Sequence, residues 1–104
     1  MYREIYSLSN KIPKRDKLGL HGIIEQTCIR MLSLSIESSL TKKADKWEII
    51  RKIRIYVETL KYLIRTEFEL NIIKREQYLS LEEKLQEISK EAVGWERYAN
   101  KNSP

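Results

Sequence analysis

The sequence predicts an all-α protein, an antiparallel four-helix bundle with a short first helix and three long helices. Apolar residues recur at alternating steps of three and four over two long stretches, which is the spacing of a buried helical face. The chain has only three glycines and two prolines among 104 residues, too few for a sandwich or barrel with many tight turns. No pattern typical of strands competes with the helical one.

The first helix is expected over residues 2–11, and Pro13 ends it because proline disfavours helical geometry in the preceding residue. A second helix is expected from Asp16, a suitable N-cap, to about Leu40, although two glycines lie in its first turns. Its buried stripe is expected to contain Ile24, Cys28, Met31 and Ser35, widened by Leu20, Ile23, Leu32 and Leu34.

The two strongest helical patterns follow. Thr41 is the expected N-cap of a third helix that stops at Asn71, with a seam of Ile50, Ile53, Val57, Leu60 and Ile64, continued by Phe68 and Leu70. A fourth helix begins near Lys74 with a seam of Tyr78, Leu81, Leu85, Ile88, Ala92, Trp95 and Ala99. The bundle is expected to be one domain over 1–99, with 100–104 as a frayed tail.

The composition excludes several classes of site. One cysteine, Cys28, excludes an internal disulfide, and one histidine, His21, makes a zinc site of protein ligands improbable. Cys28 lies within an apolar stripe, which indicates a small core residue and not a nucleophile. There is no 18-residue apolar run and no signal-peptide pattern, so we expect a cytoplasmic protein with no membrane contact. No cofactor, metal or catalytic residue is predicted.

One spacing leaves an enzymatic alternative open. Arg15 and His21 are separated by five residues, a spacing that resembles the Arg–His motif of small helical ribonucleases of the HEPN class. The alternative to a catalytic histidine is that His21 is a surface residue in the first turn of the second helix.

Basic residues are the better functional candidates. Residues 1–65 carry 14 basic and 7 acidic side chains, a net of +7, whereas residues 66–104 carry 6 and 8, a net of −2. Such an excess favours anionic partners such as nucleic acid. The candidate nucleic-acid-binding residues lie on the third helix, with a second cluster after Pro13: Lys43, Lys46, Arg51, Arg54, Lys61 and Arg65, then Lys14 and Arg15 beside Lys17.

Two interpretations of these basic residues remain open. Lysine and arginine facing phosphates would supply affinity that is independent of base sequence and falls with salt. We expect little base preference, because no aromatic stacking platform accompanies the strip. The other interpretation is a solvated face of mixed charge, since Asp45, Glu48 and Glu58 are interleaved.

Two segments carry a family resemblance. The run from Ile12 to Leu20, Ile-Pro-Lys-Arg-Asp-Lys-Leu-Gly-Leu, resembles the opening of a four-helix-bundle superfamily with two branches. One branch contains proteins encoded in intervening sequences of bacterial 23S ribosomal RNA genes, and Leu32–Ser39 departs from its second-helix motif. The ending, Gln77-Tyr78, a leucine seam and Gly94-Trp95, is similar to the other branch, the accessory variability determinants of diversity-generating retroelements.

This resemblance implies a function. Accessory variability determinants are non-enzymatic, form a pentameric barrel of bundles, and bind a reverse transcriptase and nucleic acid through basic surfaces. They support error-prone cDNA synthesis from a template-repeat RNA. The expected partners are therefore a reverse transcriptase, template-repeat RNA and possibly DNA. The alternative from the first branch is an oligomeric scaffold that does not bind nucleic acid.

Assembly is also expected from the aromatic residues. Tyr2, Tyr6, Trp47 and Tyr62 present more aromatic surface than one small bundle can bury. Aromatic residues are enriched at the centres of protein interfaces. The sequence therefore predicts a homo-oligomer larger than a dimer, and the family resemblance alone favours a pentamer.

Overall fold

The computed structural model describes the backbone of residues 1–101, and their side chains except at positions 17, 18 and 99–101. This part of the chain contains helices and no strand, so the all-α prediction is confirmed. The elements are α1 (Tyr2–Leu8), the 3-10 helix η1 (Ser9–Lys11), α2 (Lys14–Leu18), α3 (Leu20–Leu40), the 3-10 helix η2 (Lys43–Asp45), α4 (Lys46–Glu69) and α5 (Arg75–Lys101).

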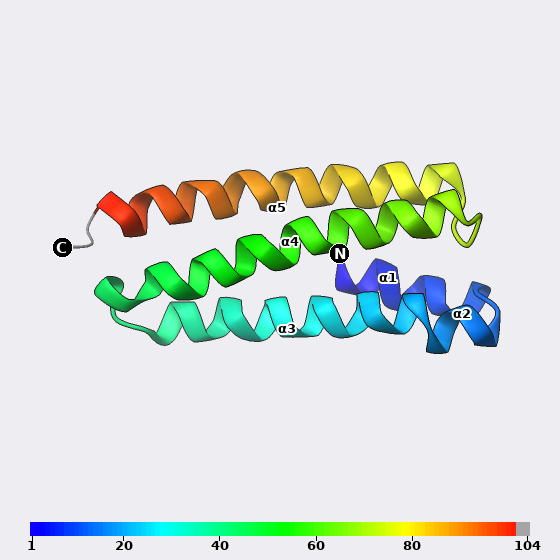
Figure 1. Ribbon diagram of the computed structural model, residues 1–104, viewed down its shortest axis with the longest axis horizontal. Coiled ribbons are helices and arrows are strands. Elements are labelled where there is room, and N and C mark those ends of the chain that lie inside the picture. Colours follow the sequence, from blue (N-terminus) through cyan, green and yellow to red (C-terminus); the bar gives the residue numbers. More distant parts are fainter. Residues whose placement is uncertain (102–104) are drawn as a thin grey trace.

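The three long helices lie side by side in a rod measuring 49 × 21 × 17 Å (Figure 1). The connection from α3 to α4 is at one end of the rod, and α2 and the connection from α4 to α5 are at the other. Helix α1 lies beside α3 and extends only from mid-length to the α2 end. We call the part of the rod alongside α1 the covered half and the rest the open half.

The core is built from the predicted seams. All five seam residues of α4 between Ile50 and Ile64 are buried, as are Leu81, Leu85 and Ala92 of α5. Helix α3 contributes Ile24, Cys28 and Met31, and the N-terminal segment contributes Ile5, Leu8 and Ile12. The heptad spacing therefore identified the core-facing side of both long helices.

The predicted second helix is broken. It begins at Lys14, directly after Pro13, and Asp16 is not its N-cap. The chain departs from helical geometry at Gly19, between α2 and α3, with φ −91° and ψ −112°. A Cβ at Gly19 would lie 3.2 Å from the Arg15 carbonyl oxygen, a tighter contact than side chains normally make. A residue without a side chain therefore suits this junction.

The predicted role of Thr41 is wrong. Its hydroxyl donates to the Glu37 carbonyl at 2.6 Å, so Thr41 caps the end of α3 and does not start the next helix. Helix α4 begins four residues later than that N-cap implied, at Lys46, after the turn of η2. The end of α4 agrees with prediction, because Asn71 has φ 61°, and the Asn71 and Ile72 N–H groups donate to Phe68 and Glu67.

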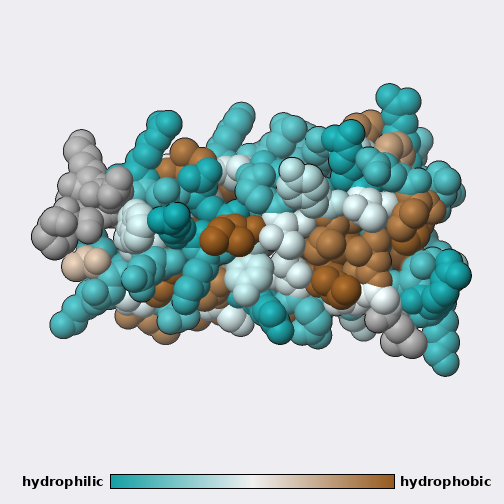
Figure 2. All heavy atoms as spheres, viewed as in Figure 1, coloured by the Kyte–Doolittle hydropathy of each residue, from teal (hydrophilic) through white to brown (hydrophobic). Residues whose placement is uncertain are grey.

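Several residues assigned to the core lie at the surface. Ile23 and Leu32 are each 55% exposed, and Trp95 is 44% exposed. Leu70 is also exposed, because it follows the last residue of α4. The spacing places Leu32 and Trp95 near the core, but α1 is too short to cover them. Ala99, the last predicted seam residue, lies outside the described side chains. Figure 2 shows apolar groups among the charged ones on the face in view.

Candidate nucleic-acid interface

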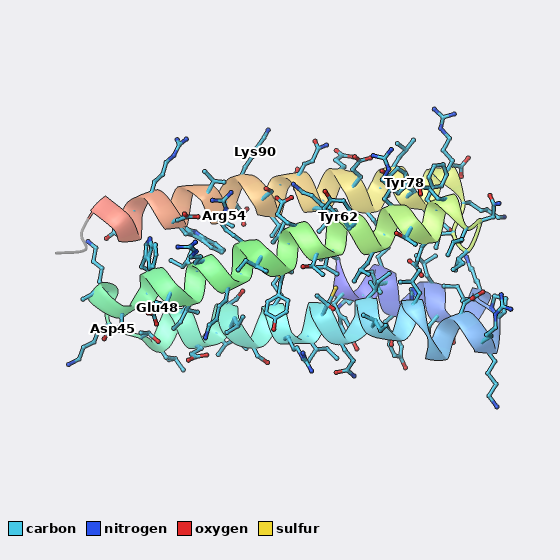
Figure 3. The ribbon with its side chains drawn as sticks, viewed as in Figure 1. Asp45, Glu48, Arg54, Tyr62, Tyr78 and Lys90 are labelled. Atoms are coloured by element: carbon cyan, nitrogen blue, oxygen red, sulfur yellow. The ribbon has the colours of Figure 1, made fainter. Side chains whose placement is uncertain are left out.

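The predicted basic strip exists as one face of α4. Arg51 and Arg54 line one hollow beside α5, and Lys61 and Arg65 line the next. The two hollows share Glu58 and are continuous along the helix. From Arg51 to Arg65 the strip is about 21 Å long at 1.5 Å per residue. Figure 3 shows Arg54 on the side of α4 that faces α5.

Carboxylates compensate most of this strip. Arg54 Nη1 lies 2.6 Å from Glu96 Oε2 of α5, and Lys61 Nζ lies 3.2 Å from Glu58 Oε1. Arg65 Nε lies 3.0 Å from Glu69 Oε1, a hydrogen bond that raises the pKa of the guanidinium above its usual value. A phosphate that approached these three cations would have to displace a carboxylate from each.

Three other basic residues near the η2 end of the open half are different. Among the described side chains, no carboxylate lies within 4 Å of a cationic nitrogen of Lys43, Lys46 or Arg51. Asp45 and Glu48 lie at the same end of the rod (Figure 3), so this surface has mixed charge without close pairing. These three cations are therefore available for phosphate contacts without the loss of an existing ion pair.

Aromatic rings accompany these cations. Lys43 Nζ lies 4.1 Å from the centre of the Tyr98 ring, and Arg51 Cζ lies 5.2 Å from the centre of the Trp47 ring. Aromatic side chains beside a basic groove are the combination on which bases of a single strand stack. Of the strip itself, Arg51 has an aromatic neighbour in Trp47, and Tyr98 lies at η2. The expectation of little base preference stays a prediction.

The second predicted basic cluster lies elsewhere. Lys14 and Arg15 are on α2, at the opposite end of the rod from η2 (Figure 1). The Arg15 side chain is 92% exposed, with Nε 3.7 Å from Asp16 Oδ1. Lys17 lies outside the described side chains. The structure thus separates Lys14 and Arg15 from Lys43 and Lys46.

A buried polar cluster joins α1, α3 and α4 in the covered half. His21 is 0% exposed and Glu67 is 1% exposed. His21 Nδ1 lies 2.8 Å from Glu67 Oε2, and Nε2 lies 2.7 Å from the Ile5 carbonyl oxygen. Glu25 Oε1 is 3.6 Å from Nε2. His21 therefore links three helices through both of its ring nitrogens.

The protonation of this cluster follows from its partners. A carbonyl only accepts, so His21 Nε2 donates to Ile5. Burial disfavours the charged ring, but the hydrogen bonds to Glu67 and Ile5 and the charges of Glu67 and Glu25 outweigh it, and the pKa of His21 is raised. These contacts favour the imidazolium, which donates from Nε2 to Ile5 and from Nδ1 to Glu67 Oε2.

This geometry corrects the interpretation of His21 as a surface residue. It also separates the two residues of the ribonuclease-like spacing, since His21 is buried and Arg15 points into solvent. Both ring nitrogens already have partners, so the cluster presents no accessible base to a substrate. The cluster contributes to packing, and nothing in its geometry favours the ribonuclease alternative.

The spacing of His21 and Glu67 in the sequence could have predicted that they are buried together. Glu67 follows Ile64 by three and so continues the alternating steps of the α4 seam, where a carboxylate requires a cation. His21 precedes Ile24 by three and so extends the buried stripe of α3. A histidine and a glutamate at core positions of adjacent helices predict a buried pair.

Other chemistry is not indicated. Burial raises the pKa of the Cys28 thiol to about 12, which suits a core residue and not a nucleophile. Within the described part of the chain, no group of three histidine, cysteine or carboxylate side chains could hold a metal ion. Among the described helices, none combines the length and the apolar character that a membrane crossing needs.

Comparison of the chain with protein-family models, with curated proteins and with solved structures finds no match.

Proposed function

We propose that this protein is a non-enzymatic accessory factor of a diversity-generating retroelement. It binds the reverse transcriptase and template-repeat RNA, or DNA, and supports mutagenic cDNA synthesis in the cytoplasm. The proposal rests on the resemblance of the segment from Ile12 to Leu20 and of the Gly94-Trp95 ending, together with the basic face of α4. In this proposal five antiparallel bundles assemble into a ring or barrel.

One observation carries the nucleic-acid part of the proposal. Lys43, Lys46 and Arg51 have no close carboxylate partner among the described side chains. Arg51 begins the strip on α4, and Lys46 lines the neighbouring hollow beside Trp95. Repetition of this surface in an oligomer would multiply weak phosphate contacts. Affinity should therefore be high only in the assembled protein and should fall as salt rises.

The test of function is co-purification. The tagged protein is expressed with a candidate reverse transcriptase, with and without its template-repeat RNA. A stable complex that contains the polymerase supports the proposal. If neither the polymerase nor the RNA is retained under any of these conditions, the proposal is wrong.

Assembly has its own support and its own test. Tyr6 and Tyr62 are exposed in the single chain, and Tyr2 and Trp47 are half-buried. Light scattering at micromolar concentration should give a mass several times 12.5 kDa. A mass near 12.5 kDa would contradict the oligomer.

The ion pairs favour a second candidate function. Because Arg54, Lys61 and Arg65 are already paired with carboxylates, the α4 face also fits an oligomeric scaffold that does not bind nucleic acid. A titration with single-stranded RNA separates the two candidates, since a scaffold gives no saturable binding even at low salt.

A further inference from the structure

Helix α1 occupies one half of a longer groove between α3 and α5. It buries Ile5 and Leu8, and Ile12 follows at the next step of the same pattern. These three residues pack in the core cluster with the long helices. The covered half therefore shows what this groove accepts: an amphipathic helix with aliphatic residues at alternating steps of three and four.

The groove continues past Met1 into the open half. A hollow of about 200 Å³ begins at Met1 and Tyr2 and runs between Leu32 of α3 and Ile88 of α5. A second hollow of about 280 Å³ adjoins it and ends near Lys46. The two hollows share Ser35, Ile53 and Trp95, so they form one groove that is continuous with the α1 interface.

The open half is lined by apolar and small polar side chains. Leu32 of α3 is 55% exposed at its edge, and Ser35, Ser38 and Ser39 follow along the same helix. Trp95 stands on the α5 side. Apart from His21, helix α3 has only three charged residues among 21, in a chain in which aspartate, glutamate, lysine and arginine make up 34%. Depletion of charge around exposed apolar side chains is typical of the centre of a protein interface.

One charged residue on the groove wall indicates which charge a bound helix would carry. In the covered half, Lys84 of α5 forms an ion pair with Glu4 of α1. Glu91 lies two helical turns, about 10.5 Å, further along α5 and lines the open groove. Among the described side chains Glu91 has no ion-pair partner. A helix that continued the course of α1 would therefore meet a negative charge where α1 meets a positive one.

We propose that the open half of this groove is the docking site for an amphipathic helix of a partner protein. That helix has about three turns, aliphatic residues at alternating steps of three and four, and a lysine or arginine opposite Glu91. This proposal does not depend on nucleic-acid binding or on the identity of the polymerase.

The experiment uses the full chain carrying Trp47→Phe, so that Trp95 is its only tryptophan. The probe is an acetylated and amidated 14-residue peptide of alanine and glutamine. It has leucine at positions 3, 6, 10 and 13. Lysine stands at positions 2 and 9, each directly before a leucine, as Glu4 stands directly before the buried Ile5 in α1. Titration should move the Trp95 emission to shorter wavelength with saturation, because the peptide removes the indole from water.

Charge exchange tests specificity. Glu91→Lys should lower the affinity of the protein for the lysine peptide about tenfold. A peptide with glutamate at positions 2 and 9 should recover the lost affinity. The matched control is Glu83→Lys, an exposed position on α5 that does not line the groove, and it should leave affinity unchanged.

Three results would overturn the proposal. The first is absence of a saturable shift with the leucine peptide, or an equal shift with serine in place of leucine. The second is equal affinity for Glu91→Lys and the parent chain. The third is that Trp95 is already shielded from water in the free protein, and that Leu32→Glu both exposes Trp95 and lowers the mass found by light scattering. These results together would mean that a second copy of the chain fills the groove.

Discussion

The two halves of the rod bury and expose different kinds of residue. In the covered half, α1 closes the groove and the His21–Glu67 pair joins three helices away from water. In the open half the same groove is uncovered, Trp95 and Leu40 face solvent, and Lys46 lacks a close carboxylate partner among the described side chains. Both proposed binding surfaces therefore include residues of the open half.

We propose that a short helix divides this bundle between stability and binding. Where α1 is present, both ring nitrogens of His21 have partners within the fold, although Glu25 Oε1 and Glu67 Oε1 are buried without a hydrogen bond. Where α1 is absent, the chain leaves apolar and basic side chains for another molecule.

Removal of one member of the buried pair should give the largest loss. Glu67→Ala leaves the His21 imidazolium without its carboxylate partner, which should lower the free energy of unfolding by about 3–5 kcal/mol. The double change His21→Leu with Glu67→Leu should be much less damaging, since it removes both charges and keeps apolar volume. Urea denaturation measures both. A loss below about 1 kcal/mol for Glu67→Ala would show that the pair is not buried as described.

Truncation of two side chains of α5 should cost different amounts of stability in the two halves. Leu85→Ala removes a buried side chain from the α5 seam and should cost about 2–5 kcal/mol. Trp95→Ala, on the open groove, should cost less than about 1 kcal/mol, as is usual at the surface. Equal losses in chemical denaturation would mean that Trp95 is packed as fully as Leu85.

The pH dependence of stability should come from the covered half. The pKa of His21 is raised in the folded protein, so the folded protein binds this proton more tightly than the unfolded chain does. The resulting stabilisation is fully present below the unfolded value of about 6.5 and is lost as pH rises through the higher folded pKa. The free energy of unfolding should be lower at pH 9 than at pH 6. His21→Gln should make this difference smaller. An increase with pH would contradict the assigned charge state.

Much of the fold could be predicted because the periodicity is local information. The steps from Ile50 to Ile64 predicted the buried side of α4 without any knowledge of its neighbours. Asn71 predicted a helix end through its own tolerance of positive φ. By contrast, Thr41 suits either end of a helix, and only the η2 turn that follows decides which.

The site was harder to predict because it depends on contacts between distant residues. Arg54 appeared to be a free cation, and its pairing with Glu96, 42 positions away, requires the register of α4 against α5. Trp95 fitted the seam, and only the length of α1 decides that it is exposed. The spacing of basic residues thus located the α4 face but could not tell paired cations from unpaired ones.

Nucleic-acid binding by the unpaired cations of the open half is the property on which the proposed function depends. Its most direct test is a titration of single-stranded RNA at two salt concentrations, with circular dichroism to verify the fold. Lys46→Glu with Arg51→Glu should lower affinity at least tenfold and flatten its salt dependence, because two phosphate contacts are lost. Arg54→Glu with Arg65→Glu, the matched change in paired cations, should lower it less. Unchanged affinity in folded Lys46→Glu/Arg51→Glu protein, or no saturable binding by the parent chain at low salt, would contradict the claim.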